Sequence, residues 1–381
     1  MSALSTLSSL STPASPLPRV SREQLLAFQG RAIARRVPLS GSIAMTHRCN
    51  LSCVHCYLGE ERAATSRSRE LGTPFWLDAV EQIAAAGCFD LLITGGEPLL
   101  RDDFAQVYTR AKQLGLLVTV FTNGTRLDAR HVRLFSDLPP RLVEISLYGA
   151  TRDVYEKVTG VPGSYRQCLD GVEALERAGI RVGLKTMILK GNQHEVAAMR
   201  EMAESRGASF RVDPAVVPCL DGKAGPLEQR VAPAEAIAIE MGDPKVLRKA
   251  ADHYQRVRDL PSADRLFSCG AGVINFHVAP TGILHPCLMV TGLGFDLQRG
   301  TFRTGWDEVM SRLRNMPLPS SYECQACDHR ALCGLCPALS GLETGSPYGK
   351  SAYACALGEE RHRAIAREMD SQTAAREAAP E

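Results

Sequence analysis

The sequence lacks the features that would place the chain in a membrane, on a nucleic acid or outside the cell. It has no run of about 18 apolar residues, so no segment is predicted to span a membrane as a helix. The formal net charge of +2 gives no electrostatic reason to expect a nucleic acid or an anionic membrane as a partner. The N-terminal stretch MSALSTLSSLSTPASPLPRV is rich in Ser and Pro and lacks the basic start and apolar centre of a signal peptide. We therefore expect a cytoplasmic protein whose residues 1–25 form a disordered leader.

Cysteine, by contrast, is abundant and unevenly distributed. In a reducing compartment, patterned cysteines indicate a metal site or a catalytic site rather than disulfides. Three of the thirteen cysteines share the stretch MTHRCNLSCVHCYLGEE with the spacing C-x3-C-x2-C, seven lie after residue 268, and three stand alone, as small buried side chains often do. In that order, the sets are Cys49, Cys53 and Cys56; Cys269, Cys287, Cys324, Cys327, Cys333, Cys336 and Cys355; and Cys88, Cys168 and Cys219.

Residues 26–215 alternate apolar strands with amphipathic helices. Strands that are apolar on both faces are typical of a buried parallel sheet, and the repeated strand–helix unit predicts an α/β fold, a partial (β/α)6 TIM-like barrel. In such a fold, the chemistry is expected at the carboxyl ends of the strands. Strands are predicted within 41–46, 89–98, 116–124, 141–149, 180–189 and 209–214, and helices within 73–87, 101–115, 128–138, 164–179 and 193–207.

The pattern changes after residue 215. A stretch with Pro and Gly breaks and two modest helical segments comes first, and then a small cysteine-rich domain in which a β-hairpin is expected to turn at Thr281 and Gly282. The last residues are polar, rich in Ala and predicted to fray. The predicted divisions are 1–25 (leader), 26–215 (barrel), 216–265 (connecting segment, with helices within 233–241 and 244–257), 266–365 (cysteine-rich domain) and 366–381 (tail).

Four motifs each follow a predicted barrel strand. The C-x3-C-x2-C loop follows the first strand, TGGEP the second, TNGT the third and SLYG the fourth. Because the carboxyl ends of parallel strands meet at one face of a barrel, we expect these motifs to share a single site at the barrel mouth.

Three kinds of centre could explain the first cysteine group. A structural zinc site needs four ligands, and His47 or His55 could supply the fourth, although the motif would be irregular. A redox dithiol would use Cys53 and Cys56 and leave Cys49 unexplained. A [4Fe–4S] cluster held by three thiolates would keep one iron open to a substrate or a cofactor.

The C-x3-C-x2-C loop after the first barrel strand resembles the signature of the radical S-adenosylmethionine (SAM) superfamily. The resemblance implies that the amino and carboxylate groups of SAM chelate the open iron and that an electron from the cluster cleaves SAM. The resulting 5′-deoxyadenosyl radical then takes a hydrogen atom from the substrate. It also implies an electron donor such as flavodoxin or ferredoxin.

Further positions match this superfamily. The GGEP motif is similar to the one that contacts the methionine amino group, with glycines that let the backbone approach and a glutamate that accepts from an ammonium. The residue before the third cysteine is often aromatic in the family; here it is His55, and Tyr57 is the aromatic side chain that follows the motif. By this resemblance, the cofactor-binding residues are Gly95, Gly96, Glu97, Pro98, Ser146 (toward the ribose) and Tyr57.

The second cysteine group contains CQACDHRALCGLC, with the spacing C-x2-C-x5-C-x2-C. A zinc ribbon could explain four of the seven cysteines. All seven fit a resemblance, over about residues 266–358, to the SPASM domain that carries auxiliary iron–sulfur clusters; the usual last spacing is C-x3-C rather than C-x2-C. The resemblance implies one [4Fe–4S] cluster on Cys324, Cys327, Cys333 and Cys355, and a second on Cys269, Cys287 and Cys336.

The second auxiliary cluster then has three thiolates. His277 and His285 lie on the predicted hairpin between its first two cysteines, and either could be a fourth ligand or a plain surface histidine. Auxiliary clusters can accept an electron from a product radical, relay electrons or hold substrate.

Relatives with a SPASM extension mostly modify peptides. We therefore expect the substrate to be a ribosomally synthesised precursor peptide that undergoes cross-linking, oxidation or epimerisation. The alternatives are modification of a tetrapyrrole in an alternative haem pathway, maturation of a sulfatase, or a scaffold without activity. Many peptide-modifying relatives carry an N-terminal winged-helix domain that binds the leader peptide. Only 48 residues precede Cys49, so we expect a separate leader-binding protein or direct binding by the barrel and the SPASM domain.

Three further residues are candidates for the chemistry itself. Cys219, in VDPAVVPCLDG, follows the last predicted barrel strand, and its thiol could donate a hydrogen atom to a substrate radical, as an epimerase would require. The alternatives are a buried cysteine without such a role and a cluster ligand. Lys185 and Asp213 lie near strand ends and could face the site or serve the structure, so no acid–base residue is singled out.

Overall fold

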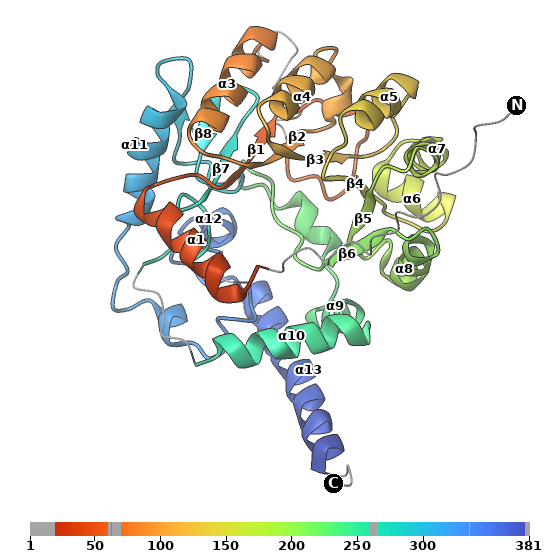
Figure 1. The fold of residues 1–381 in the computed structure, drawn as a ribbon. Coiled ribbons are helices and arrows are strands. Elements are labelled where there is room, and N and C mark those ends of the chain that lie inside the picture. Colours follow the sequence, from red (N-terminus) through yellow and green to blue (C-terminus); the bar gives the residue numbers. More distant parts are fainter. Residues whose placement is uncertain (1–19, 60–61, 63–69, 260–264, 335, 378–381) are drawn as a thin grey trace, which may run out of the picture.

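The computed structural model describes residues 20–59, 62, 70–259, 265–334 and 336–377 (Figure 1). Most of the predicted disordered leader lies outside this range. Within it, helix α1 begins at Arg22, where Ser21 caps it by accepting the amide of Gln24 at 3.1 Å. Four residues assigned to the leader, 22–25, are therefore helical.

Six parallel strands form the predicted partial barrel, and each pairs with the next one along the chain. Helices cover the outer face of this sheet (Figure 1). The strands are β1 (Ser40–Ala44), β2 (Asp90–Thr94), β3 (Leu117–Thr122), β4 (Leu142–Ser146), β5 (Val182–Met187) and β6 (Ser209–Asp213). The helices are α1 (Arg22–Ala34), α3 (Thr73–Ala85), α4 (Phe104–Gln113), α5 (Ala129–Asp137), α6 (Arg152–Thr159), α7 (Ser164–Arg177) and α8 (Val196–Ser205). The prediction of a partial barrel is confirmed.

The barrel core is built from strand residues that water cannot reach. Ile43, Ile93, Val120 and Ile145 are fully buried on four successive strands, and their β-branched side chains suit a pleated, covered surface. The sequence did not predict α6. This short helix is capped by Thr151 and ends at Gly160, which has a left-handed conformation. Its last turn accepts backbone hydrogen bonds from the cysteine loop.

The cysteine-rich region adds strands to the same sheet. A hairpin of β7 (Asn275–Val278) and β8 (Ile283–His285) is confirmed at the predicted turn, and β9 (Phe295–Asp296) follows as its antiparallel neighbour. Strand β7 pairs in parallel with β1 and makes a nine-stranded sheet. The sequence pattern predicts a region separate from the barrel, whereas the structure joins the two in one sheet. The edge of β1 offers unpaired backbone groups, and Phe276 joins the main hydrophobic core.

The remaining helices follow the barrel strands in the chain. They are α9 (Pro233–Glu240), α10 (Pro244–Val257), α11 (Phe302–Arg314), α12 (Pro337–Thr344) and α13 (Ala352–Glu377). Helix α13 packs against α9 and α10. Residues 366–377, which the sequence predicts to fray, instead continue α13, and Met369 packs against a hydrophobic cluster that contains Ile365. Among the described residues, no helix is both long and apolar enough to cross a membrane.

Candidate active site

The cysteine loop, residues 45–59, is anchored by backbone hydrogen bonds to three distant parts of the chain. These parts are the turn after β2, the end of α6 and the segment after β6. The bonds run from Gly96 N to Thr46 O (2.7 Å), Glu97 N to Arg48 O (2.8 Å), Ser52 N to Thr159 O (2.8 Å), Val54 N to Val158 O (3.0 Å) and Leu220 N to Tyr57 O (2.8 Å). The barrel therefore fixes the path of the loop before any cofactor is considered.

The GGEP motif brings the turn after β2 against this loop. Gly95 has a φ of 157°, and a Cβ there would lie 2.3 Å from the carbonyl oxygen of Thr46. At Gly96, a Cβ would lie 2.3 Å from the carbonyl oxygen of Arg48. Only glycine tolerates such a close backbone approach. Both glycines also line the cavity described below.

Glu97 and Pro98 are buried and do not line that cavity. One carboxylate oxygen of Glu97 accepts from Leu99 N (3.1 Å) and the Thr122 hydroxyl (2.8 Å), and the other accepts from Asn123 N (2.7 Å). Burial raises the pKa of Glu97 to about 7, although these bonds oppose the rise. The Glu97 side chain thus joins the turns after β2 and β3, and its predicted contact with an ammonium stays a prediction.

A cavity of about 350 Å³ opens at the carboxyl ends of the strands. As predicted from the order of the motifs, residues that follow β1, β2, β3 and β4 share it. The walls comprise Cys49, Leu51, Cys53, His55, Cys56, Tyr57, Leu58, Thr94, Gly95, Gly96, Phe121, Thr122, Asn123, Ser146, Tyr148, Lys185, Thr186, Met187, Arg211, Asp213, Ala215, Val216, Val217 and Met289.

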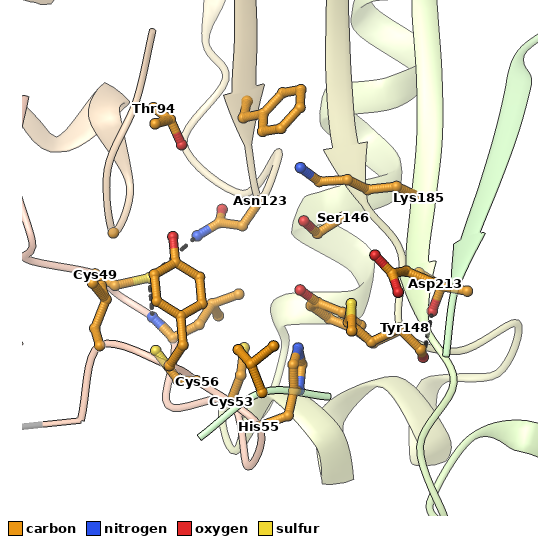
Figure 2. A pocket seen from close by; sticks show the side chains of 18 of the residues that line it. Cys49, Cys53, His55, Cys56, Thr94, Asn123, Ser146, Tyr148, Lys185 and Asp213 are labelled. Atoms are coloured by element: carbon orange, nitrogen blue, oxygen red, sulfur yellow. Dashed lines mark hydrogen bonds between the residues drawn. The ribbon is translucent and has the colours of Figure 1, made fainter. Parts of the chain in front are cut away.

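The three thiols of the cysteine loop lie together on one side of this cavity (Figure 2). The Asn123 side chain donates to the sulfur of Cys49 at 3.8 Å, and the amide of Leu51 donates to it at 3.4 Å. Burial raises the pKa of Cys49 to about 11 and that of Cys53 to about 12. Thiols so removed from water ionise when a metal replaces the proton.

The predicted ribose and adenine contacts also lie on the cavity wall. Ser146 ends β4, and Tyr57 follows the third cysteine; both are partly exposed to the cavity. The ring of His55 packs edge-on against Tyr148 with 4.6 Å between centroids, and its Nδ1 is buried without a hydrogen-bond partner among the described residues. Burial lowers the pKa of His55 to about 4, so the ring is neutral at pH 7.

Charged side chains occupy the wall across from the thiols (Figure 2). Lys185 on β5 and Arg211 on β6 lie opposite each other in the strand register and line the cavity. Both pair with Glu144 on β4, which is buried behind them. Asp213 ends β6 on the same wall, and its Oδ1 accepts the amide of Ala215 at 2.9 Å. Lys185 and Asp213, the two acid–base candidates from the sequence, therefore both face the site.

Comparison with known families explains this arrangement of thiols at a barrel mouth. Residues 43–204 match the Radical SAM superfamily. This part of the chain is a radical SAM domain. Among solved structures, SuiB of Streptococcus suis bound to S-adenosylmethionine shares the fold with a TM-score of 0.66, at 14% identity over 89% of this chain and 82% of SuiB.

Three curated relatives align with most of this radical SAM enzyme. The AdoMet-dependent heme synthase of Methanosarcina barkeri is 27% identical over 81% of this chain and 94% of the relative. The pre-heme d1 synthase of Dinoroseobacter shibae is 27% identical over 82% and 85%. The mycofactocin maturase MftC of Mycobacterium ulcerans is 27% identical over 85% and 91%.

The cofactors of a radical SAM enzyme are a [4Fe–4S] cluster and SAM, and the site fits them. Three thiols open onto a cavity with polar groups on its far side. Among the described residues, no group of three or more His, Cys, Asp or Glu side chains is arranged to hold a single metal ion. Thiolates that bind different irons of one cluster do not need to meet at one point.

Cys219 does not line the cavity of this radical SAM enzyme. Its thiol is buried, donates to the carbonyl of Cys56 at 3.8 Å, and lies 3.0 Å from where a Cβ of Gly59 would stand. It packs behind the cysteine loop. This burial favours the alternative of a buried cysteine, and the hydrogen-donor role stays a prediction.

The C-terminal cysteines gather in two neighbouring places. Four of them surround a second cavity of about 100 Å³, which Cys336 also lines; the four are Cys324, Cys327, Cys333 and Cys355. Burial raises the pKa of Cys287, and its neighbours Cys336 and Cys269 raise it further. The structure thus brings together both sets of thiols that the sequence analysis had grouped.

His277 and His285 differ from the surface histidines that were one alternative. His277 is buried, and its Nδ1 lies 2.8 Å from the Ser42 hydroxyl of β1. Nδ1 of His285 lies 2.8 Å from the carbonyl of Leu293. Neither ring lines the second cavity. The structure shows both histidines fixed by the extended sheet, while the fourth-ligand role stays a prediction.

Two features of the site were missed by sequence reasoning. The TNGT motif was placed correctly but given no role; Asn123 joins Cys49 to Asn50, whose amide donates to the Thr125 hydroxyl at 2.8 Å. Met289, two residues after Cys287, reaches the first cavity from the C-terminal region. No local signal marks Met289, because only the pairing of β7 with β1 brings it there.

Proposed function

We propose that this radical SAM enzyme modifies a tetrapyrrole. The proposal is carried by the similarity to two relatives named for haem synthesis. The alignment with each of them covers about four fifths of this chain and 85% or more of the relative. The similarity therefore extends beyond the superfamily region at residues 43–204. A cavity with cationic groups on its wall also suits a substrate with acidic side chains.

Modification of a precursor peptide, the substrate first expected from the sequence, is the second candidate. It is favoured by the similarity to a maturase over 91% of that relative. The likeness to SuiB is at 14% identity and supports the fold alone. Under this alternative, a separate leader-binding protein or the enzyme itself would hold the leader. Sulfatase maturation has no specific support among these relatives.

The residues of the chain have distinct tasks in the proposed reaction. Cys49, Cys53 and Cys56 bind the cluster, and the Asn123 amide fixes the orientation of the first of them. When bound, the cluster with SAM supplies reductive cleavage of SAM to a 5′-deoxyadenosyl radical. Ser146 offers its hydroxyl to the ribose, and the apolar wall keeps water from the reactive centre.

The backbone of the GGEP turn completes the cofactor site. The amides of Gly96 and Glu97 already donate to the cysteine loop. We therefore expect the methionine amino group to be bound by the carbonyl groups of Gly95 and Gly96, rather than by the Glu97 carboxylate. Tyr57 and His55 form the wall proposed for the adenine end.

The C-terminal thiols are proposed to hold two auxiliary clusters. One uses Cys324, Cys327, Cys333 and Cys355, and the other uses Cys269, Cys287 and Cys336. The second set lies next to the active cavity, because Met289 joins the cavity wall. A cluster there could take an electron from the substrate side, and flavodoxin or ferredoxin would supply the electron that starts the reaction.

Product formation distinguishes the two substrate classes. The reconstituted enzyme, reduced under anaerobic conditions, is incubated with SAM and either an iron porphyrin that carries carboxylate side chains or a short candidate precursor peptide. The proposal predicts that the porphyrin stimulates 5′-deoxyadenosine formation and that its own mass changes. Stimulation and a mass change with the peptide, but not with the porphyrin, would overturn the proposal in favour of the second candidate.

A further inference from the structure

One buried carboxylate on the barrel wall serves two cations. Nζ of Lys185 lies 3.3 Å from Oε2 of Glu144, and the Arg211 guanidinium contacts the same carboxylate with both Nη2 (2.8 Å) and Nε (3.2 Å). Glu144 is 8% exposed and does not line the cavity, whereas both cations do. The anionic partner therefore lies behind the wall and the two positive groups lie at its surface.

Lys185 is the less compensated of the two cations. Arg211 holds Glu144 through two hydrogen bonds, and its side chain is 54% exposed to solvent. The Lys185 side chain is 21% exposed, and its Nζ lies 3.1 Å from the centroid of the Phe121 ring. Burial lowers the pKa of this lysine to about 8, partly offset by Glu144, and the nearby Arg211 lowers it further.

The only other charged side chain on this part of the described wall is Asp213. It continues β6 two residues beyond Arg211, and its charge acts on that guanidinium. One of its oxygens already accepts a backbone amide, that of Ala215. Asp213 is itself an anion, so an incoming anion would bind at Lys185, whose Nζ lies over the Phe121 ring of β3.

We propose that Lys185, supported by Arg211, binds a carboxylate side chain of the substrate and so holds the substrate across the cavity from the thiols of the cysteine loop. The inference rests on the proposed function, because tetrapyrroles with acidic side chains supply this group. The Lys185 ammonium has only the Glu144 carboxylate as an anionic partner and shares it with Arg211. A carboxylate of the substrate would therefore give it a further charge-assisted hydrogen bond. Figure 2 shows Lys185 and Ser146 facing the space that separates them from Cys49 and Cys56.

Binding measurements on the reconstituted holoenzyme test this anchor. The probes are an iron porphyrin with free carboxylate side chains, its methyl ester, and SAM alone, with porphyrin binding followed by absorbance and SAM binding by equilibrium dialysis. The variant K185M should fold, because Glu144 stays paired with Arg211. Its affinity for the free acid should fall about tenfold or more, as expected for one lost hydrogen bond between charged groups.

Four comparisons make the result specific. K185M should leave the affinities for the ester and for SAM unchanged, and K185R should restore most of the affinity for the free acid. R211Q should have a smaller effect, because that side chain is half exposed. Lys190 is exposed and lies outside the cavity wall, so K190M serves as the matched control and should bind all three probes as the native enzyme does.

Each opposite outcome identifies what is wrong. If K185M weakens SAM binding and leaves porphyrin binding intact, the amine serves the carboxylate of SAM and the inference is overturned. If the free acid and the ester bind equally well to the native enzyme and to K185M, no carboxylate is recognised here, although the tetrapyrrole proposal survives. If the native enzyme binds neither porphyrin, the proposed function itself fails and the anchor falls with it.

Discussion

The two cysteine regions of this radical SAM enzyme are supported in different ways. The loop that carries Cys49 is bonded to elements far away in the sequence, from Gly96 to Leu220. Between residues 319 and 333, in contrast, backbone hydrogen bonds join residues three or four positions apart. Cys327 in this stretch is exposed. The comparison indicates that the barrel fixes the first site, and we expect the second region to owe part of its order to the clusters proposed for it.

The largest expected effect comes from removing the first thiols. Replacing Cys49, Cys53 and Cys56 together by Ala should abolish 5′-deoxyadenosine formation, because no thiolate is left to bind the cluster. The auxiliary iron should remain, since the two regions bind metal through different elements. Iron content and visible absorbance check the second expectation, and product chromatography checks the first.

Cys88 provides the control for this experiment. It is buried outside the cavity, and its thiol donates to the carbonyl of Asp90 at 3.5 Å, so C88A should still cleave SAM. Cleavage of SAM by the triple variant would contradict the assignment of the first site.

Removing iron from the native enzyme should affect amide exchange differently in the two cysteine regions. Amide exchange between residues 319 and 333 should become faster by about tenfold or more, while exchange in the cysteine loop changes much less, because its amides stay bonded to the barrel. Hydrogen exchange followed by mass spectrometry measures both in one sample. Equal acceleration in the two regions would show that the barrel does not hold the loop on its own.

A single methyl group should test how closely the loop and the GGEP turn approach. Gly96→Ala places a Cβ 2.3 Å from the carbonyl oxygen of Arg48 and 2.4 Å from that of His47, so we expect the free energy of unfolding to fall by about 1–3 kcal/mol. Chemical denaturation measures the change.

The matched substitution is Gly30→Ala in α1, where a Cβ has no heavy atom within 4 Å. Alanine is favoured over glycine inside a helix by about 0.5–1 kcal/mol, so this variant should be slightly more stable. A Gly96→Ala variant as stable as Gly30→Ala would refute the tight contact.

The smallest expected effect is the dependence of porphyrin binding on pH. Burial lowers the pKa of Lys185 to about 8, so the amine is protonated below this pH and loses its charge above it. Affinity for the free-acid porphyrin should fall as the pH rises through about 8, by no more than about tenfold per pH unit for one proton. The same profile is expected after Cys324 and Cys327 are replaced by Ala, because Lys185 and its partners Glu144 and Arg211 all lie on barrel strands.

The K185R variant distinguishes the titration of Lys185 from that of any other group. K185R stays charged over the range, so its binding should be nearly independent of pH between 7 and about 9. Glu97 also titrates near this range, with a pKa of about 7, but it lies outside the cavity. An unchanged pH profile in K185R would therefore assign the dependence to a group other than Lys185.

Much of the barrel could be predicted from the sequence, because strands such as 116–124 are apolar on both faces and end at glycine turns. The pairing of β7 with β1 could not, since it depends on which sheet edge remains open. Helix α13 was missed for a similar reason. Its polar, Ala-rich sequence reads as a tail, and only its packing against α9 and α10 makes it part of the core.

The candidate site divides in the same way. The spacing of the cysteines predicts a metal centre, and their places after successive strands predict a shared cavity. The role of a side chain within that cavity is a tertiary property. Glu97 belongs to a motif that predicts a ligand contact, but the turn after β3 surrounds its carboxylate with donors. Lys185 becomes notable only when Glu144 and Arg211 are seen beside it.

Transfer of deuterium tests the central claim most directly, that the cavity generates a radical which acts on a carboxylated tetrapyrrole. The enzyme is incubated with SAM and an iron porphyrin deuterated on its carboxylate-bearing side chains, and the 5′-deoxyadenosine formed is analysed by mass spectrometry. The account predicts that deuterium appears in 5′-deoxyadenosine, and that the K185M variant lowers this fraction while SAM cleavage continues. Unlabelled 5′-deoxyadenosine, formed at the same rate with and without the porphyrin, would contradict the account.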